Sequence, residues 1–139
     1  MQHRGESMQN KDCIYSVFKL NELVFDKIEF KREGFQNDKE IEYEIQSQIS
    51  QKEGADIYKI NLTLSGKKTE EYSFEICLTG YFSIEGNSDI TQELKNDLVS
   101  KNAIAILMPY LRSEVSLLTA QPGMECIVLP AFNINKMFE

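Results

Sequence analysis

Apolar and polar residues alternate along three consecutive stretches between residues 40 and 78, which begin near Glu40, Tyr58 and Tyr72. A period of two with one polar face is typical of antiparallel strands that pack on one side and meet water on the other. Short turn-like segments separate the three stretches. The side chains expected to point inward are Ile41, Tyr43, Ile45 and Ile49 in the first, Tyr58, Ile60, Leu62 and Leu64 in the second, and Tyr72, Phe74, Ile76 and Leu78 in the third.

Another strand is expected before these three, from Val17 to Phe30, because β-branched and aromatic residues are frequent there. Its alternation is imperfect, which predicts a bend or a β-bulge. The first half of the chain therefore predicts a four-stranded antiparallel sheet.

The hydrophobic period becomes helical after Gly86. Asp89, with Gln92 three residues later, predicts a capping box that opens a short helix. A second helix is expected to follow, with a kink at Pro109 and an end at residues 121–123, Gln-Pro-Gly. The apolar stripe of this second helix comprises Ile104, Leu107, Met108, Leu111, Val115 and Leu118.

The sheet and the helix each present one apolar face, so we expect them to pack as two layers of an α+β fold. The length of 139 residues, with 42% hydrophobic and 27% charged residues, is that of one globular domain. We expect a single domain over residues 1–139, with residues 1–14 disordered because this end is polar.

The N-terminal segment 1–11 lacks the apolar core of a secretory signal, and no run approaches the roughly 20 apolar residues of a membrane-spanning helix. Cys13, Cys77 and Cys126 are odd in number and widely spaced, which favours reduced thiols over a disulfide framework. The sequence therefore predicts a cytoplasmic protein with no membrane insertion.

The net charge of −7 arises in the middle of the chain, where residues 38–100 contain thirteen acidic and six basic residues. A nucleic-acid partner is not expected, because phosphate binding requires clustered Lys and Arg. An acidic middle suits basic partners, including unfolded segments rich in Lys and Arg, although solvated strand faces and turns give the same pattern.

Residues that carry catalytic chemistry are scarce. His3 is the only histidine, which argues against Ser-His-Asp and Cys-His nucleophile systems and against most zinc sites. The sequence contains no C-x-x-C pair, no Gly-rich phosphate loop and no H-E-x-x-H. We therefore expect no enzymatic activity, no catalytic residues, no cofactor and no metal.

The segment after Gly123 is unusually apolar and follows neither a helical nor a strict strand period. It is expected either to pack onto its own helix and sheet or to line a surface that binds other chains. Its apolar residues are Met124, Ile127, Val128, Leu129, Phe132, Ile134, Met137 and Phe138.

Two groups of residues in this region resemble the SecB family of protein-export chaperones. In that family a Pro-Tyr-x-Arg helix is followed by a Gly-bearing break and a Leu-Pro-x-x-Asn segment. The resemblance implies a four-stranded antiparallel sheet backed by a long helix, assembly as a dimer or a dimer of dimers, and ATP-independent binding of unfolded chains in apolar grooves. The matching residues are Pro109, Tyr110 and Arg112, then Leu129, Pro130 and Asn133, with Tyr81, Phe82, Ser83 and Ile84 as a further matching segment.

The resemblance also implies which residues bind clients. Carried over by position, five apolar residues of the helix end and the following segment are expected near the groove that holds unfolded chains. They are Leu118, Met124, Ile127, Leu129 and Phe132.

Export-type members of the family dock the motor ATPase SecA through acidic residues on the first and fourth strands. Glu75 matches the acid of the fourth strand, and it is the first candidate for partner docking. Lys27 and Lys31 align with the first-strand acids, whereas Asp26 and Glu29 lie nearby and complete the candidate docking set. Export-type members also continue beyond the point where this sequence ends, into a second helix and a SecA-binding tail.

Three functions remain open at this stage. The first is a general holdase for unfolded or nascent polypeptides, including preproteins for export. The second is a dedicated chaperone for one client, such as an antitoxin. The third is an adaptor that binds a folded partner through the acidic face of the sheet.

Overall fold

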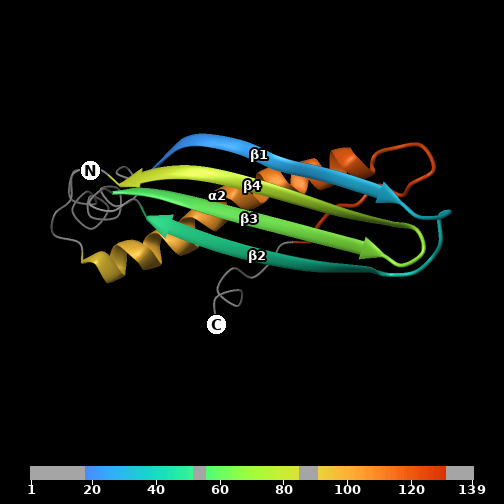
Figure 1. Ribbon diagram of the computed structural model, residues 1–139, viewed down its shortest axis with the longest axis horizontal. Coiled ribbons are helices and arrows are strands. Elements are labelled where there is room, and N and C mark those ends of the chain that lie inside the picture. Colours follow the sequence, from blue (N-terminus) through green and yellow to red (C-terminus); the bar gives the residue numbers. More distant parts are fainter. Residues whose placement is uncertain (1–17, 52–55, 85–90, 131–139) are drawn as a thin grey trace, which may run out of the picture.

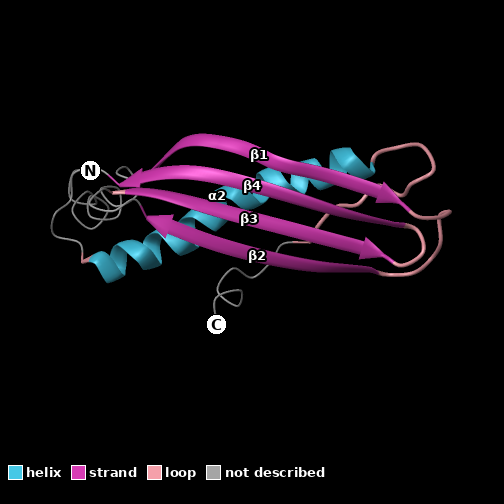
Figure 2. Cartoon of the chain, in the orientation of Figure 1, coloured by secondary structure: helices cyan, strands magenta, loops and turns pink. Residues whose placement is uncertain are grey.

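The computed structural model describes residues 18–51, 56–84 and 91–130. In these residues four strands form one sheet, and a long helix lies obliquely across one face of it (Figure 1 and Figure 2). This is the predicted α+β arrangement of a four-stranded antiparallel sheet and a helix. The elements are β1 (Phe18–Arg32), β2 (Ile41–Gln51), β3 (Ile57–Lys68), β4 (Tyr72–Ile84) and α2 (Gln92–Thr119).

The strands are ordered β1-β4-β3-β2, and every neighbouring pair is antiparallel. The pairing of β1 with β4 shifts register twice, between Leu20 and Glu22 and between Phe25 and Lys27. These two irregularities confirm the bend or bulge that the imperfect alternation of the first strand predicts. The strands β2 and β3 pair without any shift.

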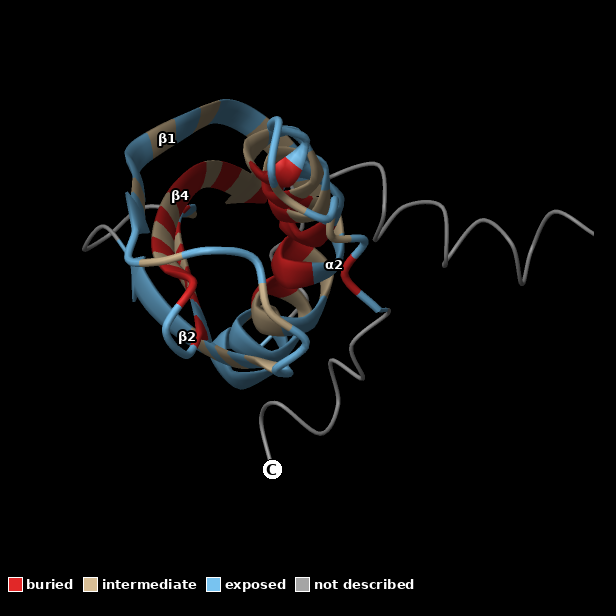
Figure 3. Cartoon of the chain, turned by 90° about the vertical axis from the view of Figure 1, so that its right-hand side faces the viewer, coloured by how far each residue is buried: buried red, intermediate tan, exposed pale blue. Residues whose placement is uncertain are grey.

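The core lies between α2 and the face of the sheet that the helix covers, here called the inner face (Figure 3). All eight side chains predicted to point inward from β3 and β4 are buried. Ile41, Tyr43 and Ile45 of the edge strand β2 are half-buried, and Ile49 is 36% exposed. Gly80 of β4 allows close helix packing, because a Cβ there would lie 2.9 Å from Cδ2 of Leu107.

The expectation of two successive helices is wrong, because α2 is a single helix of 28 residues. Thr91 is its N-cap, and the Thr91 hydroxyl accepts from the backbone N–H of Leu94 at 3.2 Å. Asp89, the predicted cap, lies outside the described residues. Ser100 and Asn102 lie within this single helix, where their side chains donate to the backbone carbonyls of Asn96 and Leu98 one turn earlier.

The helix continues through Pro109 and ends at Thr119. The residues that follow form a turn, in which the Met124 N–H donates to the Gln121 carbonyl at 3.2 Å. Gly123 in this turn has a φ of 80°, a left-handed conformation that favours glycine. The predicted helix end at residues 121–123 is therefore confirmed.

A buried ion pair closes the end of the sheet where β3 turns into β4. The Lys68 ammonium lies 2.9 Å from Oε1 of Glu71, and both side chains are almost fully buried. Asn37, between β1 and β2, donates its backbone N–H to the Glu71 carboxylate and accepts from Lys68 through its carbonyl oxygen. Burial alone would raise the pKa of Glu71, but the hydrogen bonds from Lys68 and Asn37 and the charges of Lys68 and Arg32 hold it below its ordinary value. The pair ties two connections of the sheet together.

Candidate binding groove beside the helix

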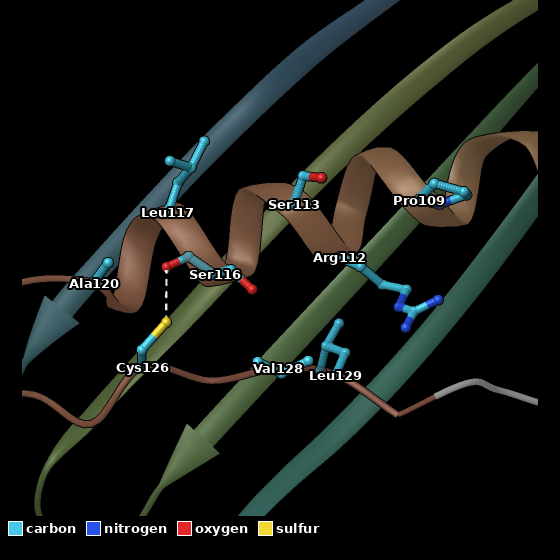
Figure 4. A pocket seen from close by; sticks show the side chains of 9 residues that line it. All are labelled: Pro109, Arg112, Ser113, Ser116, Leu117, Ala120, Cys126, Val128 and Leu129. Carbon is cyan, nitrogen blue, oxygen red and sulfur yellow. Dashed lines mark hydrogen bonds between the residues drawn. The ribbon is translucent and has the colours of Figure 1, made fainter.

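The segment that follows α2 reverses direction and runs back along the helix (Figure 4). Its residues 124–130 are here called the crossover segment. The Arg32 guanidinium at the end of β1 donates to the Gly123 carbonyl at 3.2 Å, which fixes the turn that precedes the segment.

Two hydroxyl groups of α2 hold the crossover segment at Ile127. The Ile127 N–H donates to Oγ1 of Thr119 at 2.8 Å, and the Ile127 carbonyl accepts from Oγ of Ser116 at 2.8 Å. Thr119 is itself buried and donates to the Val115 carbonyl at 2.8 Å. Because both polar groups of the Ile127 backbone are satisfied by side chains, the segment packs against the helix without joining the sheet.

Side chains of the crossover segment alternate in exposure, although the sequence showed no strict period there. Ile127 and Leu129 turn toward the core, whereas Cys126 and Val128 are exposed. A groove of about 730 Å³ lies between this exposed edge and the outward side of α2. Its lining residues are Pro109, Arg112, Ser113, Ser116, Leu117 and Ala120 from the helix, with Cys126, Val128 and Leu129 from the segment.

Two apolar side chains in the lining of this groove are mostly open to solvent. Leu117 of α2 is 70% exposed and Val128 of the crossover segment is 77% exposed. An apolar groove edged by such residues offers surface that a ligand would remove from water, and burial of apolar surface is the main source of non-specific affinity.

The five predicted client-binding residues take different positions. Leu118, Met124 and Ile127 are partly buried and pack against the core. Leu129 lines the groove but is only 1% exposed, so it belongs mainly to the core. Phe132 lies outside the described residues. Binding of clients by these five residues stays a prediction.

The sequence analysis did not single out Leu117 and Val128 as binding residues, and it used Arg112 only as part of the family motif. Leu117 carries a usable signal, because it is a large apolar residue next to Leu118 but off the apolar stripe of its helix. Val128 carries only the general signal of an apolar residue in the segment after Gly123, since its exposure depends on how the crossover segment is held against the helix.

The candidate partner-docking residues lie on the outer face of the sheet, which is the face turned away from α2. Glu29 and Glu75 are direct cross-strand neighbours. The Lys27 ammonium bonds to Glu75 and lies 3.5 Å from Glu29. The hydrogen bond to Glu75, together with the charges of Glu29 and Glu75, raises the pKa of Lys27. The structure therefore brings the two acids together but pairs them with a lysine of the same chain.

Asp26, the third docking candidate, is also engaged on this face. Its carboxylate accepts a hydrogen bond from the Thr79 hydroxyl. Thr79 in turn accepts from the Asn61 amide at 3.0 Å, and Thr63 donates to the Asn61 carbonyl oxygen at 3.2 Å. The centre of the outer face is thus a ladder of polar side chains that satisfy one another.

Within residues 18–51, 56–84 and 91–130, no three His, Cys, Asp or Glu side chains are grouped as a metal ion would require. In the same residues, no helix is both long enough and apolar enough to cross a membrane.

A family model described as "Preprotein translocase subunit SecB" matches residues 14–139, which is nearly the whole chain. This chain belongs to the SecB family. The resemblance seen in the sequence is therefore confirmed, and the family is one of chaperones and not of enzymes.

Two known proteins are similar to this chain. The protein-export protein SecB of Anaplasma phagocytophilum (strain HZ) is 28% identical over 81 residues, which are 58% of this chain and 51% of that protein. The match thus spans about half the length of that relative. A solved structure with the same fold is the Mycobacterium tuberculosis Rv1957 SecB-like chaperone in complex with a ChAD peptide from the Rv1956 HigA1 antitoxin. It has a TM-score of 0.69 and 12% identity, and the match covers 95% of each chain.

Proposed function

We propose that this SecB family member is an ATP-independent holdase, which binds extended segments of unfolded polypeptides in the groove between α2 and the crossover segment. The observation that carries this proposal is the pair of exposed apolar side chains, Leu117 and Val128, in the groove lining. Burying one such side chain stabilises a complex by about 1.5–3 kcal/mol before the costs of association are subtracted.

The crossover segment supports this function in two ways. Leu129 lines the groove, while Met124 and Ile127 of the segment, with Leu118 of α2, pack against the core. No described element offers a catalytic constellation, so binding by burial is the chemistry that the site provides. A client would then be released by exchange alone, with no bond made or broken.

The relatives bear on the kind of client. A SecB-like chaperone of the same fold has been solved with a peptide from an antitoxin, which supports a dedicated client, whereas the Anaplasma relative is a protein-export protein. We propose a cytoplasmic chaperone, because the described Cys77 and Cys126 are free thiols. We further propose that it assembles as a dimer or a dimer of dimers, and a strictly monomeric mass in solution would contradict this assembly.

The test is suppression of aggregation when chemically unfolded proteins are diluted without nucleotide. If the parent protein is a general holdase, it should keep several unrelated clients soluble. If it is a dedicated chaperone, it should keep soluble only one client, such as a protein encoded by a neighbouring gene or another specific partner. The double variant Leu117→Ser and Val128→Ser should lose most of this activity while its thermal unfolding changes little, since both side chains are exposed.

A matched control is the double variant Val24→Ser and Ile57→Ser, which makes the same chemical change at residues that are 40% and 42% exposed. These two residues lie on β1 and β3 rather than in the groove. The control should suppress aggregation as well as the parent does. If the groove variant matches the parent as well, the proposed binding site is wrong.

A further inference from the structure

The turn after α2 and the crossover segment, residues 120–130, are held by hydrogen bonds from the helix on one side and from the sheet on the other. On the helix side, two hydroxyl groups of α2 hold the backbone of Ile127 at 2.8 Å each. On the sheet side, the Arg32 guanidinium donates to the Gly123 carbonyl at 3.2 Å. Among the residues that the structure describes, this is the single hydrogen bond between the sheet and residues 120–130.

Arg32 reaches this turn from outside the groove. It is the last residue of β1, and the turn after α2 lies beside this end of the strand (Figure 1). Its guanidinium packs against the bare Cα of Gly123, where an added Cβ would lie 3.8 Å from Nη2 and 4.0 Å from Nη1. Arg32 does not line the groove, whereas Ala120 and Cys126, on either side of the turn, do. Arg32 can therefore act on a client in the groove only through the turn.

The two attachments differ in their exposure to water. Thr119, which binds Ile127, is buried, whereas Arg32 is exposed. An exposed hydrogen bond contributes little net stability, because water competes for both of its groups. The attachment to the sheet is therefore the weaker of the two, and its loss should release the turn while Ile127 stays in place.

We propose that Arg32 is a positioning residue for the groove, which fixes the turn at Gly123 and thereby holds Ala120 and Cys126 at the spacing that a client segment requires. This inference rests on the proposed holdase function and names a residue outside the lining that sets its affinity for clients. A client that meets a released turn must order it on binding, which costs affinity. The fraction of molecules in which the turn is fixed therefore scales the apparent affinity.

The first measurement is hydrogen exchange in the free protein. Arg32→Met keeps a long unbranched stem but removes every donor. Exchange of the Met124 N–H, which donates to the Gln121 carbonyl within the turn, should become about three- to tenfold faster, whereas exchange of the Ile127 N–H should stay near that of the parent. Arg32→Lys keeps the charge and a donor and should fall between the two. The matched control is Lys31→Met on the same strand, which should exchange like the parent.

The second measurement is the affinity of each variant for a fluorescent peptide with an apolar core, followed by anisotropy. Arg32→Met should raise the Kd about two- to fivefold, because a smaller fraction of molecules has the turn in place. Arg32→Lys should restore part of the affinity, and Lys31→Met should bind like the parent. Gly123→Ala strains the turn at a φ of 80° and should raise the Kd similarly. The double variant Arg32→Met and Gly123→Ala should bind no more weakly than the weaker single variant, and additive losses would overturn the inference.

Faster exchange at Met124 without any change in peptide affinity would overturn the inference and leave the holdase function standing. Unchanged exchange in Arg32→Met would overturn it as well. Failure of the parent to bind the peptide, together with no suppression of aggregation, would overturn both. The midpoint of thermal unfolding of Arg32→Met should stay close to that of the parent, because Glu71 keeps Lys68 and Asn37 as partners. A large fall would mean that Arg32 supports the whole fold, and this too would overturn the inference.

Discussion

The two sides of the sheet differ in how completely their side chains are paired. On the outer face, Lys27 forms ion pairs with both Glu29 and Glu75, and Asp26 accepts from Thr79. On the side that α2 covers, the groove contains exposed apolar side chains and an arginine without a described partner. A surface whose groups already satisfy one another gains little from a ligand, whereas unpaired groups gain from one. This difference is why the groove, and not the acidic face, is our candidate binding site.

The largest expected effect on stability separates two neighbouring residues that line the groove, one buried and one exposed. Leu129→Ser should lower the free energy of unfolding by about 4 kcal/mol, because it leaves a cavity and places a hydroxyl in the core. Val128→Ser, one residue away, should change the free energy of unfolding by less than about 0.5 kcal/mol, since Val128 is 77% exposed, and should weaken client binding instead.

Urea unfolding and peptide binding measure the two effects separately. The account is contradicted if Val128→Ser destabilises the fold as much as Leu129→Ser does. That result would mean that the crossover segment is packed differently and has no exposed edge.

The sequence predicts some elements of this structure better than others. The alternation of β3 and β4 predicts their buried side chains correctly, because a period of two with one apolar face leaves a single way to pack. The single 28-residue helix is wrongly predicted as two, because the polar residues 100–102 interrupt the apolar pattern without interrupting the backbone helix. A groove beside the helix end is implied only by the family resemblance. Its exposed lining residues Leu117 and Val128 are not among the predicted binding residues, since the groove's walls are brought together by the hydroxyls of Ser116 and Thr119, which no local pattern reveals.

The candidate docking residues are also only partly predictable from the sequence. The family resemblance groups Asp26, Glu29 and Glu75 as candidate docking residues, and the strand register makes Glu29 and Glu75 cross-strand neighbours. It does not reveal that Lys27 pairs with both acids, because Lys27 follows a register shift in β1 that sets the side to which its side chain points. Their role in docking a partner remains a prediction.

The next largest effect on stability is expected at the buried ion pair of Lys68 and Glu71, which lies at the end of the sheet and belongs neither to the groove nor to the outer face. Glu71→Gln should lower the free energy of unfolding by about 3 kcal/mol at neutral pH, because it leaves the buried Lys68 without its counter-ion. The pKa of Glu71 is lowered in the folded state, so its contribution is present above the ordinary value of 4.5 and is lost as the pH falls through the lower folded value.

Unfolding of the parent and of Glu71→Gln should therefore be compared from neutral pH down through this window. The difference between the two proteins should shrink as the pH falls. A difference that stays constant would show that the cost of the substitution is not electrostatic. Peptide binding at neutral pH should be the same in both proteins wherever both are folded.

The smallest expected effect on stability is on the outer face. Lys27→Gln should scarcely change the midpoint of thermal unfolding, because its ion pairs are exposed and screened by solvent. It should, however, leave Glu29 and Glu75 without their lysine partner and so increase binding of a cationic partner. Titration of SecA with the parent and with Lys27→Gln measures this change, and Lys19→Gln on the same strand is the matched control. No gain in Lys27→Gln would mean that the outer face is not a docking site.

Two native cysteines allow the central claim to be tested directly, because they lie on the two sides under comparison. Cys126 lines the groove and is exposed, whereas Cys77 is a partly exposed residue of β4 on the outer face. The measurement is the rate of alkylation of each thiol, resolved by peptide mass spectrometry, with and without an unfolded client that lacks cysteine. We predict that the client slows alkylation of Cys126 and leaves that of Cys77 unchanged. Protection of Cys77 with no protection of Cys126 would place the client on the outer face and contradict the account.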